Sequence, residues 1–160
     1  YLDSNFGGAQ KRFKTTYFGG MTNNSLGILA KDKDNITSEI YPFTGLLFNE
    51  INKFELSLPN PSSVKELDIY LSFTAGVKLQ VDSIILIDGE SNEIEINQED
   101  INVFSKSSFI LNDNSATEII LVSEEDEILN LALSKEYQNI TQILLNLKFK
   151  KFNLTNLNCN

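Results

Sequence analysis

The sequence predicts an all-β domain: an antiparallel β-sandwich, jelly-roll-like, with minor helix. Apolar side chains recur at every second position in several segments, as in Leu67, Ile69, Leu71 and Phe73, which is the period of a half-buried strand. Polar residues lie between them, so one face of such a strand meets a core and the other meets water, as in antiparallel sheets. Turn-forming residues separate roughly eight to ten such segments at spacings of about 8 to 12 residues, which is typical of sandwiches and jelly rolls.

A single domain accounts for the length of the chain. At 160 residues it can bury roughly 70% of its unfolded surface in one core without metals or disulfides. Hydrophobic residues make up 41% and charged residues 22%, as in ordinary globular domains. We therefore expect one sandwich domain over residues 1–152 and a frayed, Asn-rich tail over residues 153–160.

The first third of the chain is rich in glycine and aromatic residues. Phe6-Gly7-Gly8 and Phe18-Gly19-Gly20 repeat the same three residues, and they predict two similar turns because glycine adopts positive φ without steric cost. The pattern then predicts short strands over residues 12–18 and 26–30, a solvated loop over residues 31–35 and extended chain over residues 40–43.

The middle of the chain shows the clearest strand pattern. Residues 54–58 alternate and predict a strand, and residues 59–63, which include two prolines, predict the loop that ends it. The next predicted strand covers residues 66–73. Thr74-Ala75-Gly76 then predicts a hairpin into a strand that starts at Val77.

The strand from Val77 changes phase partway along its length. At Asp82-Ser83 the alternation gives way to Ile84-Ile85-Leu86-Ile87, which predicts a bulge or a stretch buried on both faces. Asp88-Gly89 is a turn signal before a return strand at Ile94. Further strands are predicted over residues 101–110, 118–122, 128–133 and 142–149, with a loop at residues 112–115 and a solvated turn or helix start at residues 124–127.

Charge and hydropathy exclude two classes of partner. The formal net charge is −9, from 22 acidic and 13 basic residues, so a phosphate backbone would be repelled and we expect no nucleic-acid partner. No apolar run approaches the roughly 20 residues that span a bilayer, so we expect no membrane insertion. Tyr1-Leu2-Asp3-Ser4-Asn5 lacks the basic and apolar regions of a secretion signal, and the chain resembles a segment of a longer protein.

Missing residue types exclude most catalytic mechanisms. There is no histidine, which removes the commonest general base and the Ser-His and Cys-His nucleophile systems. Cys159 is the single cysteine, so neither an intramolecular disulfide nor a thiolate zinc site can form. A pair of carboxylates is the enzyme class that survives, but alternation places most acids on solvent faces or in turns. We therefore expect no enzyme activity.

A sugar-binding surface is the functional site that the residues favour. A pyranose needs an aromatic ring against its apolar face and planar amides or carboxylates at its edge. Tyr70 is the first candidate, because it lies on the otherwise polar face of the strand over residues 67–73; the alternative is an outward tyrosine that covers a neighbouring strand. Tyr41, Tyr17 and Asp82 complete the predicted site. The alternative for the segment that contains Tyr41 is that it packs in the core. The alternative for Asp82 is that its carboxylate pairs with backbone amides.

We expect no metal site and no cofactor. Calcium is the ion that would fit best, because Asp32 with Asp34, and Asn112 with Asp113, offer oxygen ligands. Neither cluster has the closing Glu of an EF-hand loop, and Asn and Asp are also the usual turn formers. The four residues are therefore assigned to turns, with a calcium site as the alternative.

The order of these segments resembles a known family. A strand, a loop, a strand, a glycine turn and a strand ending in Ile-x-Leu-x-Asp follow one another at residues 54–58, 67–73, Gly76 and 84–88. This order resembles the carbohydrate-binding-like β-sandwich accessory modules of bacterial glycosyltransferases and other surface-polysaccharide enzymes, and residues 109–113 and 140–152 are similar to their closing strands. The chain lacks the Arg-x-Asp-Pro phrase that many such modules carry. The resemblance implies a module without catalytic residues, in the bacterial cytoplasm as part of a larger enzyme or at the cell surface.

The expected function is therefore a non-catalytic carbohydrate-binding or accessory module of a larger polysaccharide-related protein. Its partner would be a carbohydrate or a neighbouring domain of the same protein. The alternative is a structural or adhesive domain of a surface or phage-like assembly, which would hold a protein partner through a sheet face or an edge strand.

Overall fold

The computed structural model describes residues 25–71, 76–105, 109–111, 118–121 and 127–151, in which nine strands and one short 3-10 helix are found. The elements are β1 (Ser25–Lys31), β2 (Tyr41–Thr44), β3 (Ile51–Leu71), β4 (Val77–Asp88), β5 (Glu93–Ile96), η1 (Gln98–Asp100), β6 (Ile101–Phe104), β7 (Phe109–Leu111), β8 (Glu118–Leu121) and β9 (Glu127–Lys151). All pairs of these strands are antiparallel. The expected all-β, antiparallel, sandwich-like fold with minor helix is confirmed.

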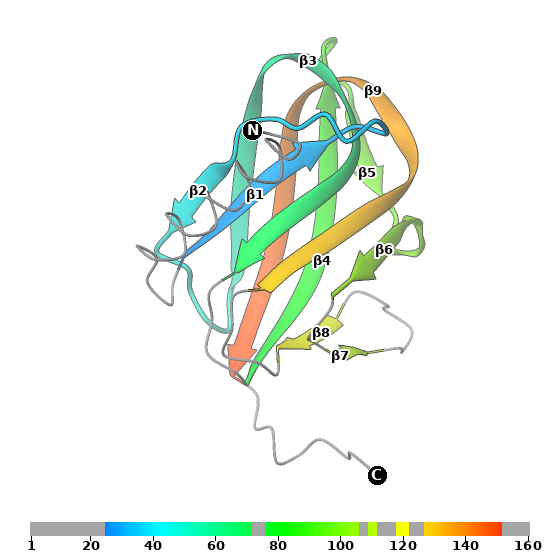
Figure 1. The fold of residues 1–160 in the computed structure, drawn as a ribbon. Coiled ribbons are helices and arrows are strands. Elements are labelled where there is room, and N and C mark those ends of the chain that lie inside the picture. The colour runs from blue at the N-terminus through cyan, green and yellow to red at the C-terminus, as the bar shows by residue number, and fades with distance from the viewer. Residues whose placement is uncertain (1–24, 72–75, 106–108, 112–117, 122–126, 152–160) are drawn as a thin grey trace, which may run out of the picture.

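Two long strands, β3 and β9, contribute to both layers of the sandwich. Residues 51–57 of β3 pair with residues 142–148 of β9, and residues 66–71 pair with residues 127–132. Between these two runs the register shifts three times, and Figure 1 shows both strands arching over one end of the molecule. The β3–β9 ribbon therefore folds over on itself, which gives the sandwich its jelly-roll-like character.

The remaining strands extend the two halves of this ribbon. In the first layer the order is β2-β1-β3-β9-β6, with the C-terminal half of β3 and the N-terminal half of β9 at its centre. In the second layer the order is β3-β9-β4-β8-β7. One edge of β4 pairs with β8 over residues 77–80 and with β5 over residues 84–87. Helix η1 follows β5 and leads the chain back to β6 in the first layer.

The core fills the space between the two inner faces. In the N-terminal half of β3 the buried side chains of Phe54, Leu56 and Leu58 alternate with exposed ones. In the C-terminal half residues 67–71 are all buried, and Leu67, Ile69 and Leu71 are the ones that belong to the main core. Phe149 of β9 is the largest fully buried side chain. Phe43 of β2 meets Phe54 edge to face, with ring centroids 4.9 Å apart, so side chains of the two layers also meet at the β2 edge.

The prediction of a loop at residues 59–63 is wrong. These residues belong to β3, which continues through Pro59 and Pro61 without interruption. The β9 register gives residues 58–61 no partner, so the missing N–H groups of the two prolines break no ladder hydrogen bond. Turn-forming residues at this point bend a strand rather than end it. For the same reason residues 128–133 and 142–149 are not two strands but two halves of β9.

The prediction of a hairpin after residue 73 is also wrong in its pairing. Strand β4 pairs with β9, β5 and β8 and lies in the second layer, whereas the half of β3 that precedes it lies in the first. Alternation shows which residues face the core but not which layer a strand joins. Residues 101–110, expected as one strand, contain β6 and the start of β7 as separate elements.

Two local predictions on β4 are confirmed. The register with β9 shifts between Val81 and Ser83, where the bulge was expected. The turn at Asp88-Gly89 leads into β5, with the Ser91 N–H donating to the Asp88 carbonyl at 3.0 Å. Several expectations lie outside the described residues: the strand at 12–18, both Phe-Gly-Gly turns, the loop at 112–115, most of the segment 124–127 and the tail.

A membrane-spanning helix would have to be long and apolar, and the described residues contain none of that kind.

Neighbouring leucines of β9 test which face meets the core. Leu145 is fully buried between the layers, whereas Leu144 is half-buried on the outer face. We expect Leu145→Ala to lower the free energy of unfolding by about 2–5 kcal/mol, because it leaves a cavity, and Leu144→Ala to lower it by about 1 kcal/mol or less. Urea unfolding of both variants measures the difference. An equal loss of unfolding free energy in the two variants would contradict the assignment of Leu145 to the inner face and Leu144 to the outer face.

Candidate functional site

Three of the four residues predicted to bind sugar are described by the structure, and these three do not come together. Tyr41 is in register with Ile28 of β1, and Tyr70 is in register with Gly27, the residue before Ile28. Because successive residues of a strand face opposite ways, Tyr41 and Tyr70 lie on opposite faces of the first layer. Asp82 lies on β4 in the second layer, and Tyr17 lies outside the described residues. No single surface therefore combines Tyr41, Tyr70 and Asp82.

Tyr70 occupies the outer face of the first layer, as its sequence position suggested, but its ring is covered. It is 3% exposed and packs with Leu29, Ile40 and Ile128. Burial raises the pKa of Tyr70 to about 12, and the nearby Asp68 carboxylate adds to the shift. A ring in this position leaves no open face for a sugar, and the structure agrees with the alternative of a tyrosine that covers neighbouring strands.

Tyr41 closes an edge of the sandwich. Its hydroxyl donates to the Ser57 carbonyl at 3.0 Å, which ties β2 in the first layer to the outer edge of β3 in the second. The ring is half-buried against the core. Burial, with a smaller contribution from the Glu39 carboxylate, raises the pKa of Tyr41. These contacts are those of a structural residue.

Asp82 lies at the β4 bulge, and its backbone rather than its carboxylate is engaged. The Gln98 Nε2 donates to the carbonyls of Val81 and Asp82 at 3.3 and 3.4 Å. These two carbonyls lie in the gap between the segments of β4 that pair with β8 and with β5, so Gln98 fills a break in the sheet edge. Sequence reasoning missed Gln98, since nothing local marks a side chain that bonds 16 residues away.

The calcium candidates that the structure describes form a turn. The Asp32 Oδ1 accepts the backbone N–H groups of Asp34 at 2.8 Å and Ile36 at 3.1 Å, and Asp34 is exposed. Asn112 and Asp113 lie outside the described residues. Within the part of the chain that the structure describes, no three His, Cys, Asp or Glu residues are grouped so that they could hold an ion.

The structure instead brings four polar side chains together on the outer face of the first layer. Lys31 of β1 pairs with Asp68 of β3 at 3.0 Å and with Glu66 at 3.4 Å. The Asn130 Nδ2 of β9 donates to the Asp68 Oδ1 at 2.7 Å and to the Glu66 Oε1 at 2.8 Å. Asp68 is 7% exposed, the one buried charged residue among those described. We call these four residues the Lys31–Asn130 network.

Strand register explains why the network forms. Lys31 is opposite Glu66, and Asp68 lies between Leu29 of β1 and Asn130 of β9. Directly opposed side chains in an antiparallel sheet have Cβ atoms about 4.5–5.5 Å apart, so a lysine, two carboxylates and an amide on three adjacent strands must meet. The alternation showed that these residues face outward, but only the pairing of three distant segments could reveal the contact.

An exposed aromatic ring lies beside the network. Phe104 of the edge strand β6 is opposite Asn130 and is 58% exposed. Two residues earlier on the same face of β6, Asn102 is opposite Ala132 of β9, and Ala132 is opposite Glu66 of β3. The single methyl group of Ala132 thus lies between an amide and a carboxylate, with the Phe104 ring next to them. We call this surface the Phe104 face.

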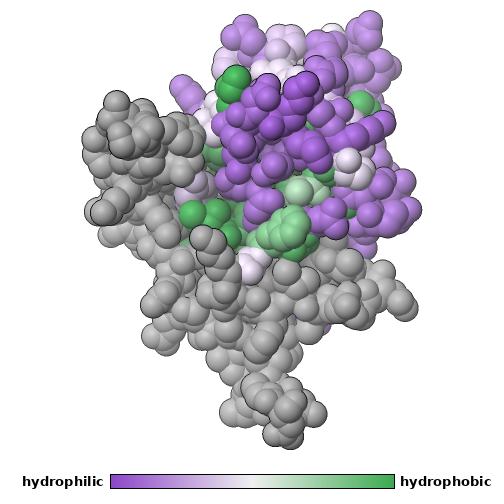
Figure 2. Space-filling view, turned by 45° about the vertical axis from the view of Figure 1, so that its right-hand side comes forward, coloured by the Kyte–Doolittle hydropathy of each residue, from purple (hydrophilic) through white to green (hydrophobic). Residues whose placement is uncertain are grey.

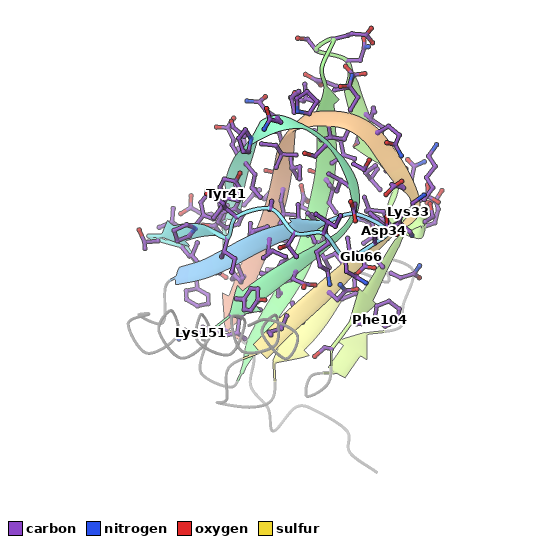
Figure 3. The ribbon with its side chains drawn as sticks, turned by 45° about the horizontal axis from the view of Figure 1, so that its top comes forward. Lys33, Asp34, Tyr41, Glu66, Phe104 and Lys151 are labelled. Carbon is purple, nitrogen blue, oxygen red and sulfur yellow. The ribbon has the colours of Figure 1, made fainter. Side chains whose placement is uncertain are left out.

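The figures show where the Phe104 face lies. In Figure 3, Phe104 and Glu66 are on one side of the molecule and Tyr41 is on the other. On the side of the molecule that carries β6, the described residues are largely hydrophilic and include a smaller hydrophobic patch (Figure 2). An aromatic ring bordered by amides and a carboxylate has the chemistry that binds the apolar face and the hydroxyl groups of a pyranose.

A small hollow lies elsewhere on the molecule, where the loop after β1 meets the bend of β3. Its volume is about 110 Å³, and its lining includes Asp32, Ser38, Leu58 and Ser63. Small-molecule pockets usually have volumes of about 300–1,000 Å³, so this hollow is too small for an ordinary ligand site. The open sheet face at Phe104 is the better candidate.

None of the protein-family models, curated proteins or solved structures that were compared with this chain matches it. The Phe104 face is therefore interpreted from its own residues and geometry.

Titration of the tyrosines tests the burial of Tyr70. We expect one of the five phenols to ionise near pH 12 in the folded protein and to be missing in Tyr70→Phe. Because the folded state keeps this proton while the unfolded state loses it near pH 10, stability should fall as pH rises from about 10 to 12, by at most about 1.4 kcal/mol per pH unit for this group. Ultraviolet titration and urea unfolding measure both effects. Five phenols that ionise together near pH 10 would contradict the burial.

Proposed function

We propose that this domain is a non-catalytic module that binds carbohydrate through the Phe104 face and so acts as an accessory to a larger polysaccharide-related protein. The observation that carries the proposal is the exposed Phe104 ring next to the Lys31–Asn130 network. Both parts of a sugar site, an aromatic surface and fixed planar polar groups, lie on one sheet face.

The network would hold its polar groups in place before a sugar arrives. The Asn130 Nδ2 is fixed by two carboxylates, and among the described residues no hydrogen bond uses its Oδ1, which can accept from a hydroxyl group. Glu66, with a side chain 27% exposed, can accept another. Side chains that are already ordered lose little entropy on binding. The Phe104 ring would cover the C–H face of the same sugar.

The carboxylates of the network suit binding better than catalysis. A glycosidase needs two acids about 5–9.5 Å apart on either side of a glycosidic bond. Glu66 and Asp68 instead accept from the same amide nitrogen and pair with the same lysine, so they lie on one side of any ligand. An open face with one ring implies weak affinity for a single sugar, with a dissociation constant on the order of millimolar.

A protein-binding, structural or adhesive role is the second candidate. It is favoured by two large apolar side chains near the start of β3, Leu47 and Ile51, which are 53% and 48% exposed. In this case the module would hold a partner protein or a second copy through that region. Concentration-dependent self-association that is lost in Leu47→Ser would support this candidate over sugar binding.

Substitution of Phe104 tests the carbohydrate proposal. A glycan array identifies a ligand, and titration calorimetry then compares the unmodified protein with Phe104→Ala. We expect the variant to bind about tenfold more weakly, because it loses the aromatic contact. Ile36→Ala is the matched control, since Ile36 is an apolar loop residue that is 68% exposed and belongs neither to the network nor to β6, and the affinity of this variant should be unchanged.

Two results would overturn the proposal. The first is the absence of binding to any glycan at millimolar concentration. The second is an equal loss of affinity in Phe104→Ala and Ile36→Ala, which would place the sugar elsewhere.

A further inference from the structure

A group of lysines lies on the outer face of the second layer, on the opposite side of the sandwich from the Phe104 face. Lys78 and Gln80 of β4 and Lys148 and Lys150 of β9 surround one spot on this face, and Lys53 of the neighbouring β3 lies one strand away. The whole chain has only 13 basic residues against 22 acidic ones. We call these four lysines, with Gln80, the lysine patch.

The strand register forces the lysines of the patch together. Lys78 is directly opposite Lys150, and Gln80 is directly opposite Lys148. Lys53 is opposite Asn146, so it is diagonal to Lys148. Neighbouring strands are about 4.8 Å apart, and diagonal partners on one face are about 7–8 Å apart. The ammonium groups can therefore reach a single ligand together.

This arrangement works against the stability of the sheet. Like charges directly opposite one another in an antiparallel pair are destabilising, as Lys78 and Lys150 are. The ion pairs found among the described residues both belong to Lys31, so none of them relieves Lys148 or Lys150. Glu118 of β8 holds the register position opposite Gln80, which leaves the patch with more positive than negative charge.

We infer that the lysine patch is a second binding surface, which holds the acidic groups of an anionic polysaccharide. This inference takes the class of ligand from the proposed function and adds a substrate class to it: a glycan that bears carboxylate or sulfate groups. The ammonium of lysine is a compact charge on a flexible stem and can follow acidic groups spaced along a chain. A glycan is preferred over a nucleic acid because the proposed Phe104 face would bind the same class of ligand, and a nucleic acid is an outcome that the test includes.

The test compares polymers that differ in charge. Affinity electrophoresis of the full chain is run through gels that contain neutral dextran, dextran sulfate or polygalacturonate, at two salt concentrations. We expect the acidic polymers to retard the protein, at least one of them more strongly than dextran does, and the effect to weaken with salt. Single-stranded DNA is included as an anionic polymer that is not a glycan.

Two double variants with the same change in net charge separate the patch from the overall charge. Lys148→Gln with Lys150→Gln removes half of the patch, and Lys33→Gln with Lys135→Gln changes two exposed lysines elsewhere. We expect the patch variant to bind the acidic polymer about tenfold more weakly and the control to bind within about twofold of the unmodified protein. Thermal unfolding of the patch variant should occur at the same or a higher temperature, because the like-charge pair is gone.

Each outcome either supports or overturns the inference. Three results would overturn it. They are an equal loss of affinity in the two double variants, no retardation by acidic glycans, and tighter binding of DNA than of either acidic glycan. If Phe104→Ala still weakens glycan binding while the patch variant does not, the proposed function stands and this inference fails. If only the patch variant weakens binding, the inference stands and the role of the Phe104 face fails.

Discussion

The antiparallel ladder between β3 and β9 is the interaction on which the rest of the structure depends. It forms the centre of the first layer and one side of the second, and β1, β4 and β6 each pair directly with one of its two strands. A shift of one residue in this register would turn the core residues of both layers outward at the same time. The three register shifts between residues 57 and 66 all lie at the bend between the layers, so each half of the ladder keeps a continuous register of its own.

The folded ladder also decides which charges lie together on each outer face. Each long strand crosses from one layer to the other, so its outward side chains end on opposite sides of the molecule. Glu66 and Asp68 of β3 face outward from the first layer, where the single charge of Lys31 pairs with both carboxylates. Lys148 and Lys150 of β9 face outward from the second layer. The two faces thus differ in charge although they are built on the same pair of strands.

Sequence alone could predict the local features of this fold but not its long-range pairing. Alternation located the strands around Leu67 and Leu145, and the break at Asp82-Ser83 located the bulge, because each depends on neighbours along the chain. The continuity of β3 through Pro59, the burial of Tyr70 and the Lys31–Asp68 pair each depend on strands far away in sequence. For the same reason the candidate site moved from Tyr70 to Phe104, which only the pairing of β6 with β9 brings next to Asn130.

The Lys31–Asn130 network is not accounted for by stability. Asp68 is 7% exposed, so folding removes its charge from water at a cost in free energy. The ion pair with Lys31 at 3.0 Å offsets that cost but adds little net stability. Well-packed apolar residues in the place of such a pair often stabilise a fold as much or more. Tyr70, Leu29 and Ile128 on the same face show that apolar side chains do pack there. What apolar residues would not supply is a fixed amide and carboxylate beside the exposed Phe104 ring. The placement of this polar network next to that ring therefore favours the proposed binding surface over a purely structural role.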